Sequence, residues 1–366
     1  MDAAAYTSWK RGFVEAALRR AGVMAEVAEP VQVPPASRRR ARFFVEQGAS
    51  SLKLGFQGRR SHDVVDMTTC LVLEPVLFAL TRPLRAYFAE TLGAGDRAEA
   101  EVQLVDGALD VLIREPATLD MEKREKLARF AAEAGIARLF WEGLDTRVTG
   151  PRRGPRVRAR RATAPAEPEI IVERTPIAAC FGGINVPLPP LAFIQASTRG
   201  EAILRDAVAA AVPGGARVAD LFSGAGTFTF PLATFPLAGG RRVTAFDGDG
   251  ELIDALNAAA RAAGLGATVT GQRRNLVRRP LSIRELDHFD AVVLDPPRAG
   301  ALTQVRELAA SKVPRVVMVS CNPESFARDA KALIDGGYDL GPGPVLPVDQ
   351  FVWTRHLELV ASFSRF

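Results

Sequence analysis

The sequence is poor in the residues that build metal centres and disulfide frameworks. Among its 366 residues there are three cysteines and three histidines. The cysteines Cys70, Cys180 and Cys321 are an odd number without paired spacing, which argues against a disulfide framework and against a zinc site. We therefore expect no metal centre built from cysteine and histidine.

Long apolar runs are also missing. Glycine, proline or a charged residue interrupts each apolar stretch before the roughly 18 residues that a membrane span requires. The first ten residues lack the basic segment of a signal peptide. With 48% apolar and 24% charged residues, the composition is that of an ordinary globular protein long enough for two domains. We expect a cytoplasmic protein that does not bind membranes and that is a monomer.

The positive charge is unevenly distributed. The net charge is +5, and arginines concentrate in the first half, at residues 38–42 and 152–161. Guanidinium groups suit phosphate because their planar fork gives bidentate hydrogen bonds. These clusters indicate either a partner that is a polyanion or, alternatively, solvated basic loops without a partner.

The second half, residues 191–366, alternates short apolar runs with alanine-rich helical patterns. This alternation is typical of βαβ units and predicts a doubly wound, mainly parallel α/β domain. We expect strands at residues 217–221, 242–246, 289–294 and 313–319. We expect helices at residues 198–212, 224–237, 251–263, 302–311 and 324–336.

The first half, residues 1–190, has a different pattern and predicts a smaller α+β domain. Helices are expected at residues 9–20, 71–92 and 121–134, and strands at 40–45, 51–56, 101–105, 108–113 and 169–172. Asp106-Gly107 between two of these strands predicts a two-residue hairpin turn. The proline-containing stretch 150–169 is expected to be a loop or hairpin tip.

A glycine-containing motif follows the first strand of the α/β domain. Asp220-Leu-Phe-Ser-Gly224-Ala-Gly226-Thr places paired glycines where the backbone could approach a ligand closely. Asp247 ends the next strand, at the spacing where nucleotide-binding folds place a carboxylate against ribose hydroxyls. The motif lacks a Gly-Lys-Ser/Thr phosphate cradle and the third glycine of the dinucleotide fingerprint. A nucleoside ligand without a diphosphate fits better, which indicates S-adenosylmethionine.

Two later strands end in residues that carry chemistry. Asp295-Pro-Pro supplies a carboxylate followed by a stiff loop, although a purely structural turn is the alternative. Ser320-Cys321-Asn-Pro follows a buried strand and presents a candidate nucleophile at its carboxyl end; a small buried apolar residue is the alternative. Phe193-Ile-Gln195 lies at the domain junction and could line the ligand.

The final segment, residues 351–360, alternates with the period of a strand. His356 and Glu358 would then share a face, opposite Leu357 and Leu359. A carboxylate within an apolar strand has a raised pKa, which suits a general base. An exposed edge position is the alternative.

Taken together, these motifs closely resemble the RNA uracil-C5 methyltransferase family, which makes 5-methyluridine in 23S ribosomal RNA and in tRNA. The motifs that carry the resemblance are Phe193-x-Gln195, Asp220-Leu-Phe-Ser-Gly-x-Gly-Thr, Asp295-Pro-Pro-Arg-x-Gly300, Ser320-Cys-Asn-Pro323 and His356-x-Glu358. Residues 9–10, 36–42, 64–66 and 70–75 look more like the ribosomal RNA branch than the tRNA branch. The resemblance implies the class I S-adenosylmethionine-dependent methyltransferase fold.

The resemblance also implies roles for individual residues. The Cys321 thiolate would add to C6 of the uracil ring, and Glu358 would later remove the proton at C5. The residues expected to line the cofactor and uracil pocket are Gln195, Phe222, Gly224, Thr227, Asp247, Asn275 and Asp295. The target uridine would have to be unpaired or flipped, and the basic first domain would hold the flanking phosphates.

The chain departs from the ribosomal RNA enzymes in one respect. Those enzymes usually begin with a small RNA-binding β-barrel and a Cys-x5-Cys-x2-Cys pattern, which with a later cysteine ligates a [4Fe-4S] cluster. Cys70 matches that later ligand but has no cysteine partners, so we expect no iron-sulfur cluster. Either the chain is a cluster-free member, which we favour, or its gene begins further upstream.

Three other functions remain as alternatives. A tRNA uracil-C5 methyltransferase would share every motif above. An N6-adenine or amino-group methyltransferase also uses an Asp-Pro-Pro loop, but it typically has an aromatic residue where this chain has Arg298 and needs no Ser-Cys-Asn-Pro. A non-catalytic RNA-binding paralogue would have no use for both Cys321 and Glu358.

Overall fold

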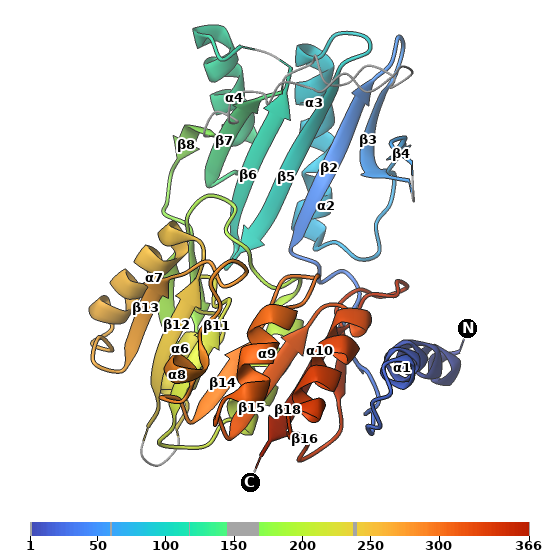
Figure 1. The fold of residues 1–366 in the computed structure, drawn as a ribbon. Coiled ribbons are helices and arrows are strands. Elements are labelled where there is room, and N and C mark those ends of the chain that lie inside the picture. Colours follow the sequence, from blue (N-terminus) through green and yellow to red (C-terminus); the bar gives the residue numbers. More distant parts are fainter. Residues whose placement is uncertain (1, 59–60, 117, 145–167, 237–239, 366) are drawn as a thin grey trace, which may run out of the picture. The chain divides into compact units, whose positions relative to one another are not determined.

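The computed structural model describes residues 2–58, 61–116, 118–144, 168–236 and 240–365 (Figure 1). The chain divides into two compact units. Unit 1 comprises residues 1–37 and 178–366, and unit 2 comprises residues 38–177. This division differs from the expected boundary between residues 190 and 191, because the N-terminal helix α1 (Ala3–Arg20) and the hairpin after residue 177 belong to unit 1.

Unit 1 is the expected doubly wound α/β domain. Its main α/β elements are α5 (Thr198–Ala211), β11 (Arg217–Leu221), α6 (Thr229–Thr234), β12 (Arg242–Asp247), α7 (Gly250–Ala262), β13 (Val269–Arg273), α8 (Ile283–Leu286), β14 (Ala291–Leu294), α9 (Leu302–Ala310), β15 (Arg315–Ser320), α10 (Pro323–Asp335), β16 (Asp339–Leu340), β17 (Leu346–Asp349) and β18 (Glu358–Ser364). The short strands β1 (Val31–Gln32), β9 (Ala178–Phe181) and β10 (Ile184–Pro187) complete it.

The strand order of the large sheet indicates where a ligand can bind. The order is β1-β17-β18-β15-β14-β11-β12-β13, with β16 paired to β18. The path reverses between β11 and β14, which is the topological switch point where such sheets bind ligands. Strand β18 runs antiparallel to β15 and β17, whereas β15, β14, β11, β12 and β13 are mutually parallel. The first residue of β18 therefore lies at the same edge as the last residues of the parallel strands.

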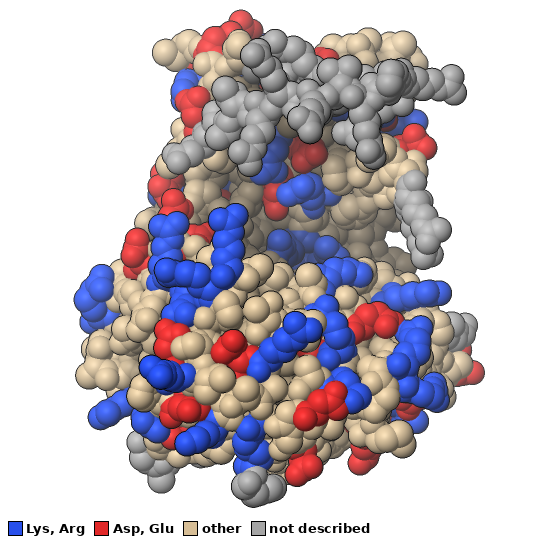
Figure 2. Space-filling view, viewed as in Figure 1, with Lys and Arg blue, Asp and Glu red and all other residues tan. Residues whose placement is uncertain are grey.

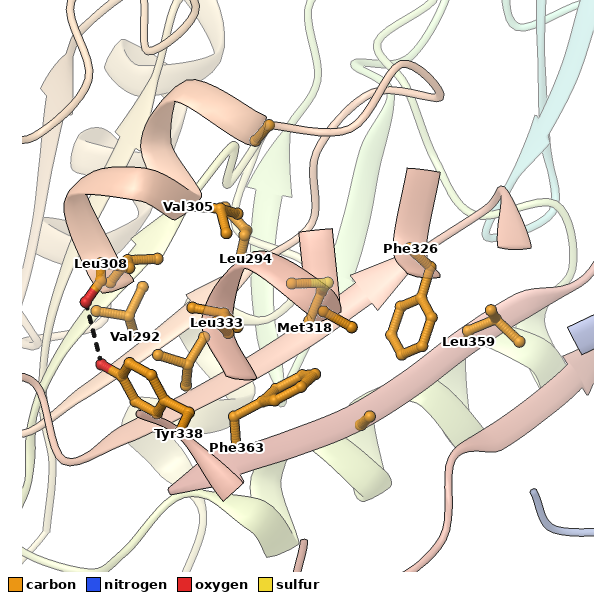
Figure 3. Packing of buried hydrophobic residues seen from close by; sticks show 14 of the residues in the cluster. Val292, Leu294, Val305, Leu308, Met318, Phe326, Leu333, Tyr338, Leu359 and Phe363 are labelled. Atoms are coloured by element: carbon orange, nitrogen blue, oxygen red, sulfur yellow. Dashed lines mark hydrogen bonds between the residues drawn. The ribbon is translucent and has the colours of Figure 1, made fainter. Parts of the chain in front are cut away.

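The sheet is held by a core between its strands and the helices α9 and α10. Strand β14 is buried along its whole length, which explains its continuous apolar sequence Ala-Val-Val-Leu. Figure 3 shows Leu294, Met318 and Leu359 from three strands packed beside Phe326 of α10. Each such side chain contributes about 1.5–3 kcal/mol when fully buried. Tyr338 joins this core and donates a hydrogen bond to Val313 O at 2.7 Å.

Helix α1 packs against α10 within unit 1. Asp2 caps its first turn by accepting a hydrogen bond from Ala5 N at 2.7 Å. The buried face of α1 consists of Lys10, Val14, Ala17 and Leu18, a spacing of one helical stripe. A lysine on that stripe is exceptional because an unpaired buried ammonium would be costly.

Unit 2 is an α+β domain, as expected. Its elements are β2 (Arg40–Gln47), β3 (Leu52–Gln57), β4 (Val64–Asp66), α2 (Pro75–Ala79), α3 (Thr81–Thr91), β5 (Arg97–Val105), β6 (Ala108–Glu115), α4 (Met121–Glu133), β7 (Arg138–Gly143) and β8 (Glu169–Glu173). The sheet order is β4-β3-β2-β5-β6-β7-β8, antiparallel except for the pair β6 and β7, which α4 connects. One apolar cluster unites the sheet with α2, α3 and α4.

The expected Asp-Gly hairpin is confirmed. Val105 pairs with Ala108, so Asp106 and Gly107 form a two-residue loop between β5 and β6. Both have positive φ, 45° and 89°, which this turn type requires and which asparagine, aspartate and glycine tolerate best.

Several sequence-based element predictions are wrong in extent: the helix expected at 9–20 begins at Ala3 and the strand expected at 101–105 begins at Arg97, and three others differ for a physical reason. The helix expected at 71–92 is divided into α2 and α3 and begins only at Pro75. The helix expected from Gly224 begins at Thr229, because the glycine-containing segment is a turn. The strand expected from residue 351 begins at Glu358, because residues 350–357 form an irregular loop that is held by side chains. Within the described ranges, no helix is both long and apolar enough to span a membrane.

Candidate active site

The expected site residues converge on one edge of the large sheet. Cys321 directly follows β15 and Glu358 begins β18. Because Ser320 pairs with Leu359 in the antiparallel register, the same register sets Cys321 opposite Glu358. Asp295 directly follows β14, and Asp247 ends β12. The candidate nucleophile and the candidate base thus lie next to each other at the ends of the adjacent strands β15 and β18.

Cys321 is half-buried at the mouth of a pocket of about 380 Å³, which Phe13, Arg298, Arg355 and His356 also line. Burial, with smaller contributions from the negative charges of Glu358 and Asp295, raises the pKa of the Cys321 thiol to about 11. The Arg298 guanidinium acts in the opposite direction. The resting thiol is therefore protonated, and additional positive charge beside it would favour the thiolate.

Glu358 is only 6% exposed. Burial, with a smaller contribution from the neighbouring Asp295, raises its pKa to about 8. Such a carboxyl group is mostly protonated at neutral pH, and it can act as a general base once a nearby positive charge lowers this pKa.

Asp295 and Asp220 form a second acidic pair beside Glu358. Burial, with a smaller contribution from the charge of Asp220, raises the pKa of Asp295 to about 7, although the residue keeps some exposed surface. Asp220 is fully buried, and its own pKa is also raised to about 7 by burial. Its Oδ2 accepts a hydrogen bond from Thr229 at 2.5 Å, whereas its Oδ1 has no partner among the described residues. The site therefore has an excess of negative charge that a cationic ligand would compensate.

The glycine-containing turn supplies an open backbone surface next to these acids. Phe222, Gly224 and Gly226 have φ values of 62°, 55° and 105°. A Cβ atom at Gly224 would meet no atom within 4 Å, whereas one at Gly226 would clash with the Phe230 ring at 2.8 Å. The space above Gly224 is thus free for a ligand, while Gly226 is required for packing.

Asp247 borders the same space. Its Oδ2 accepts a hydrogen bond from Gly224 N and its Oδ1 accepts one from Asp249 N, both at 2.9 Å. These bonds fix the carboxylate at the end of β12 and leave further lone pairs for a ligand hydroxyl. The acidic pair, the open glycine and the fixed carboxylate together fit S-adenosylmethionine, which carries a sulfonium and an ammonium cation.

The remaining expected residues occupy the surroundings of this space. Asn275 lies next to the backbone at Gly248 and accepts a hydrogen bond from Arg278 N at 3.1 Å. Gln195 is 4% exposed and accepts a hydrogen bond from Gln350 Nε2 at 3.3 Å. Thr227 is half-buried in the glycine-containing turn. Their contacts to cofactor or uracil remain predictions.

Two parts of the site were not singled out from the sequence. Asp220 was considered only as the first residue of the glycine-containing motif and Thr229 follows that motif, yet the two side chains form a buried hydrogen bond. Tyr6 and Lys10 of α1 contact the loop that precedes Glu358. The signal that could have indicated Lys10 is its position on the apolar stripe of α1.

The other two cysteines belong to other parts of the fold. Cys70 is partly exposed at the border of the unit 2 core. Cys180 is exposed in β9. Within the described residues, no group of three or more His, Cys, Asp or Glu side chains is arranged to hold a metal ion.

The basic segments have different surroundings. On β2 of unit 2, Arg42 forms an ion pair with Glu101 at 2.9 Å, and Arg39 is only 5% exposed. Some arginines at 38–42 are therefore paired or buried within unit 2 and do not present a free positive charge to solvent. The arginine run 152–161 lies outside the described residues. Figure 2 shows that Lys and Arg side chains are also spread widely over the visible face of unit 1.

Comparisons with known proteins show what this chain is similar to. Residues 252–365 match the family described as tRNA (Uracil-5-)-methyltransferase. An RNA methyltransferase of Mesorhizobium japonicum is 35% identical, with 100% of this chain and 80% of that protein covered. The 23S rRNA (uracil(1939)-C(5))-methyltransferase of Bordetella parapertussis is 34% identical, with 85% of this chain and 64% of that protein covered.

A solved structure supports the fold. The Pyrococcus abyssi tRNA (uracil-54, C5)-methyltransferase, in complex with S-adenosyl-L-homocysteine, matches with a TM-score of 0.70 and 21% identity, covering 98% of this chain and 83% of that one. The sequence relatives are similar enough to establish the family. The chain therefore belongs to the RNA uracil-C5 methyltransferase family and is an S-adenosylmethionine-dependent RNA methyltransferase.

Proposed function

We propose that this enzyme methylates C5 of a uridine in 23S ribosomal RNA through a covalent adduct between Cys321 and C6 of the uracil ring. The single observation that carries the proposal is the register that sets Cys321 opposite Glu358 at the ligand edge of the sheet. The Bordetella relative supports ribosomal RNA as the substrate.

The chemistry divides between two residues. Uracil C5 is a weak nucleophile, so Cys321 Sγ adds to C6 and makes C5 an enolate carbon. The cofactor supplies an electrophilic methyl group, and the new C5–methyl bond forms as the sulfonium–methyl bond breaks. Glu358 then accepts the proton from C5, the Sγ–C6 bond breaks, and the Cys321 thiolate is released.

The raised pKa values fit this division. With a pKa of about 11, the thiol of Cys321 needs compensation before it ionises. The cationic cofactor, held near Asp295 and Asp220, would offset their negative charge and lower that pKa. Glu358, with a pKa of about 8, is mostly protonated at neutral pH without ligand, so the same cationic cofactor would also have to lower the pKa of Glu358 before this residue accepts the C5 proton.

The first prediction concerns the covalent adduct. Glu358→Gln should accumulate a protein–RNA adduct that survives denaturation, because it can form the Sγ–C6 bond but cannot remove the C5 proton. Cys321→Ala should form no adduct and no 5-methyluridine. Denaturing electrophoresis of labelled RNA and mass spectrometry of nucleosides measure the two outcomes.

The control is Cys180→Ala, which removes an exposed cysteine of β9 that does not line the pocket at Cys321 and should keep wild-type turnover. Wild-type turnover in Cys321→Ala would show that Cys321 is not the nucleophile. If the wild-type protein makes no 5-methyluridine in any RNA, the non-catalytic alternative holds.

The RNA target is tested in cells. Mapping 5-methyluridine in ribosomal RNA and in tRNA, with and without this gene, should reveal one site that disappears from 23S rRNA. Disappearance of a tRNA site instead would favour the tRNA enzyme, which the description of the matched family keeps as the second candidate.

A further inference from the structure

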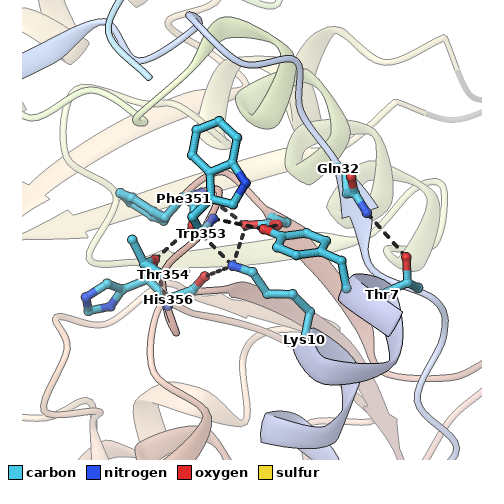
Figure 4. A network of polar contacts seen from close by, with 9 residues as sticks. Thr7, Lys10, Gln32, Phe351, Trp353, Thr354 and His356 are labelled. Atoms are coloured by element: carbon cyan, nitrogen blue, oxygen red, sulfur yellow. Dashed lines mark hydrogen bonds and ion pairs between the residues drawn. The ribbon is translucent and has the colours of Figure 1, made fainter. Parts of the chain in front are cut away.

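A buried polar network joins helix α1 to the loop that precedes Glu358 (Figure 4). The side chains of Lys10 and Asp349 are both 0% exposed, and Lys10 Nζ donates to Asp349 Oδ1 at 2.7 Å. Asp349 is the last residue of β17. Two charges removed from water are tolerated only where their geometry is good and their other donors and acceptors are satisfied.

The other hydrogen bonds of Lys10 hold both ends of the loop. Lys10 Nζ donates to Phe351 O and to His356 O, each at 3.1 Å. An ammonium has three donors, so this lysine uses all of them on Asp349 and on two carbonyl groups that lie five residues apart. His356 is only two residues before the proposed base Glu358.

Tyr6 adds a contact to the middle of the same loop. Its hydroxyl donates to Asp349 Oδ2 at 2.6 Å and accepts a hydrogen bond from Trp353 N at 3.0 Å. Trp353 has a φ of 62°, which is unfavourable for a residue with a large side chain and persists only where surrounding contacts impose it. The network thus imposes a specific backbone path on residues 350–357.

The loop ends in the proposed active site. His356 Nδ1 lies 3.1 Å from Arg298 Nη1, and both residues line the pocket at Cys321. At the first residue of the loop, Gln350 Oε1 accepts hydrogen bonds from Ser197 N and Ser197 Oγ, both at 3.1 Å. Sheet pairing begins only at Glu358, so the residues just before it depend on side-chain anchors.

We propose that Lys10, assisted by Tyr6, is a positioning residue for the elimination step: it fixes the loop at residues 350–357 and thereby the approach of Glu358 to the C5 proton. The inference rests on the proposed function. Among the described residues, Lys10 and Tyr6 do not hydrogen-bond to Cys321, and the network reaches Cys321 through His356 and Arg298, which line its pocket. We therefore expect addition to C6 and methyl transfer to depend on the network less than elimination does. Misplacement of a catalytic group by a fraction of an ångström is enough to slow its step severalfold.

The test separates the two halves of the reaction. RNA transcripts carrying the mapped target site are prepared with uridine or with 5-fluorouridine. After methyl transfer to 5-fluorouridine there is no proton at C5 to remove, so the adduct persists whatever the base does. The rate of adduct formation then reports Cys321 and methyl transfer, and turnover of normal RNA also requires elimination.

Lys10→Met should form the 5-fluorouridine adduct within threefold of the wild-type rate. On normal RNA it should turn over at least tenfold more slowly and accumulate the adduct. Tyr6→Phe, which removes one hydroxyl, should shift the same balance by at least threefold. If Lys10→Met does not fold, Tyr6→Phe alone tests whether the network positions Glu358.

Two controls exclude a general loss of stability. Arg19→Met changes an exposed basic residue of the same helix, and Tyr338→Phe removes a buried hydroxyl that is bonded to Val313 O, away from the loop. Both should leave the ratio of the two rates unchanged. If Lys10→Met and Tyr6→Phe slow both rates equally, or neither, the positioning role is overturned. If the wild-type protein forms no 5-fluorouridine adduct, the proposed function itself fails.

Discussion

At the scale of single residues, Asp220 is a buried acid whose ionisation affects the stability of the fold. The carboxyl group is fully buried, and one oxygen has no partner among the described residues. Burial raises its pKa from 3.8 to about 7. The folded state therefore favours the protonated form, and stability from this group is present below about pH 4 and is lost as the pH rises through about 7.

Asp220→Asn should remove this pH-dependent destabilisation because the amide cannot ionise. At about 1.4 kcal/mol per pKa unit, the free energy of unfolding at pH 8 should exceed that of the wild type by a few kcal/mol, and at pH 4 the two should be similar. Denaturant unfolding at pH 4, 6 and 8 measures the difference.

Asp290→Asn is the matched control. The hydrogen bond and charge of Arg217 lower the pKa of Asp290, so its contribution is present above about pH 4 and disappears only in acid. This variant should therefore leave the slope between pH 5 and 8 unchanged. An equal slope in Asp220→Asn and wild type would show that the Asp220 charge does not act on stability.

Among the larger segments of the chain, residues 152–161 carry the prediction about RNA binding. Replacing Arg152, Arg153 and Arg156 with alanine should weaken RNA binding at low salt. The slope of log affinity against log salt concentration should fall by up to about 0.7–0.9 for each phosphate that an arginine no longer neutralises. Fluorescence anisotropy at several salt concentrations measures both quantities.

A suitable control for this segment is Arg217→Ala, because Arg217 already pairs with Asp290 at 2.8 Å. It should change neither affinity nor slope. A salt slope that stays at the wild-type value in the triple variant would indicate a solvated loop that does not touch RNA.

For the molecule as a whole, the number of cysteines decides whether the chain can bind an iron-sulfur cluster by itself. They cannot provide four thiolates, and Cys321 is assigned to catalysis, so the protein purified without oxygen should contain no iron and should show no visible absorbance. Cys70→Ser should cost at most about 1–3 kcal/mol of stability, the value for an unpaired buried hydroxyl, and less because Cys70 is partly exposed.

Iron and absorbance measurements on wild type and Cys70→Ser check this expectation. Stoichiometric iron and sulfide that disappear in Cys70→Ser would contradict it and would require ligands from another chain.

Local sequence patterns were sufficient to predict the α/β class, the strand that ends in Asp247, the strands that end just before Asp295 and Cys321, and the Asp-Gly hairpin. Continuous apolar runs mark buried strands, and turn residues mark their ends. The motifs around Cys321 and Glu358 also identified the family, because residue types at fixed spacing can be recognised without any knowledge of packing.

Which of these residues meet depends on the tertiary structure. The strand order and the antiparallel β18 bring Glu358 to Cys321, and no local pattern encodes a pairing between distant strands. The loop at 350–357 alternates like a strand, yet it is irregular because Lys10 and Tyr6, more than 340 positions earlier, satisfy its backbone groups. Unit 1 likewise includes residues from both ends of the chain. Apolar side chains that pack in one core can come from segments that are far apart in the sequence.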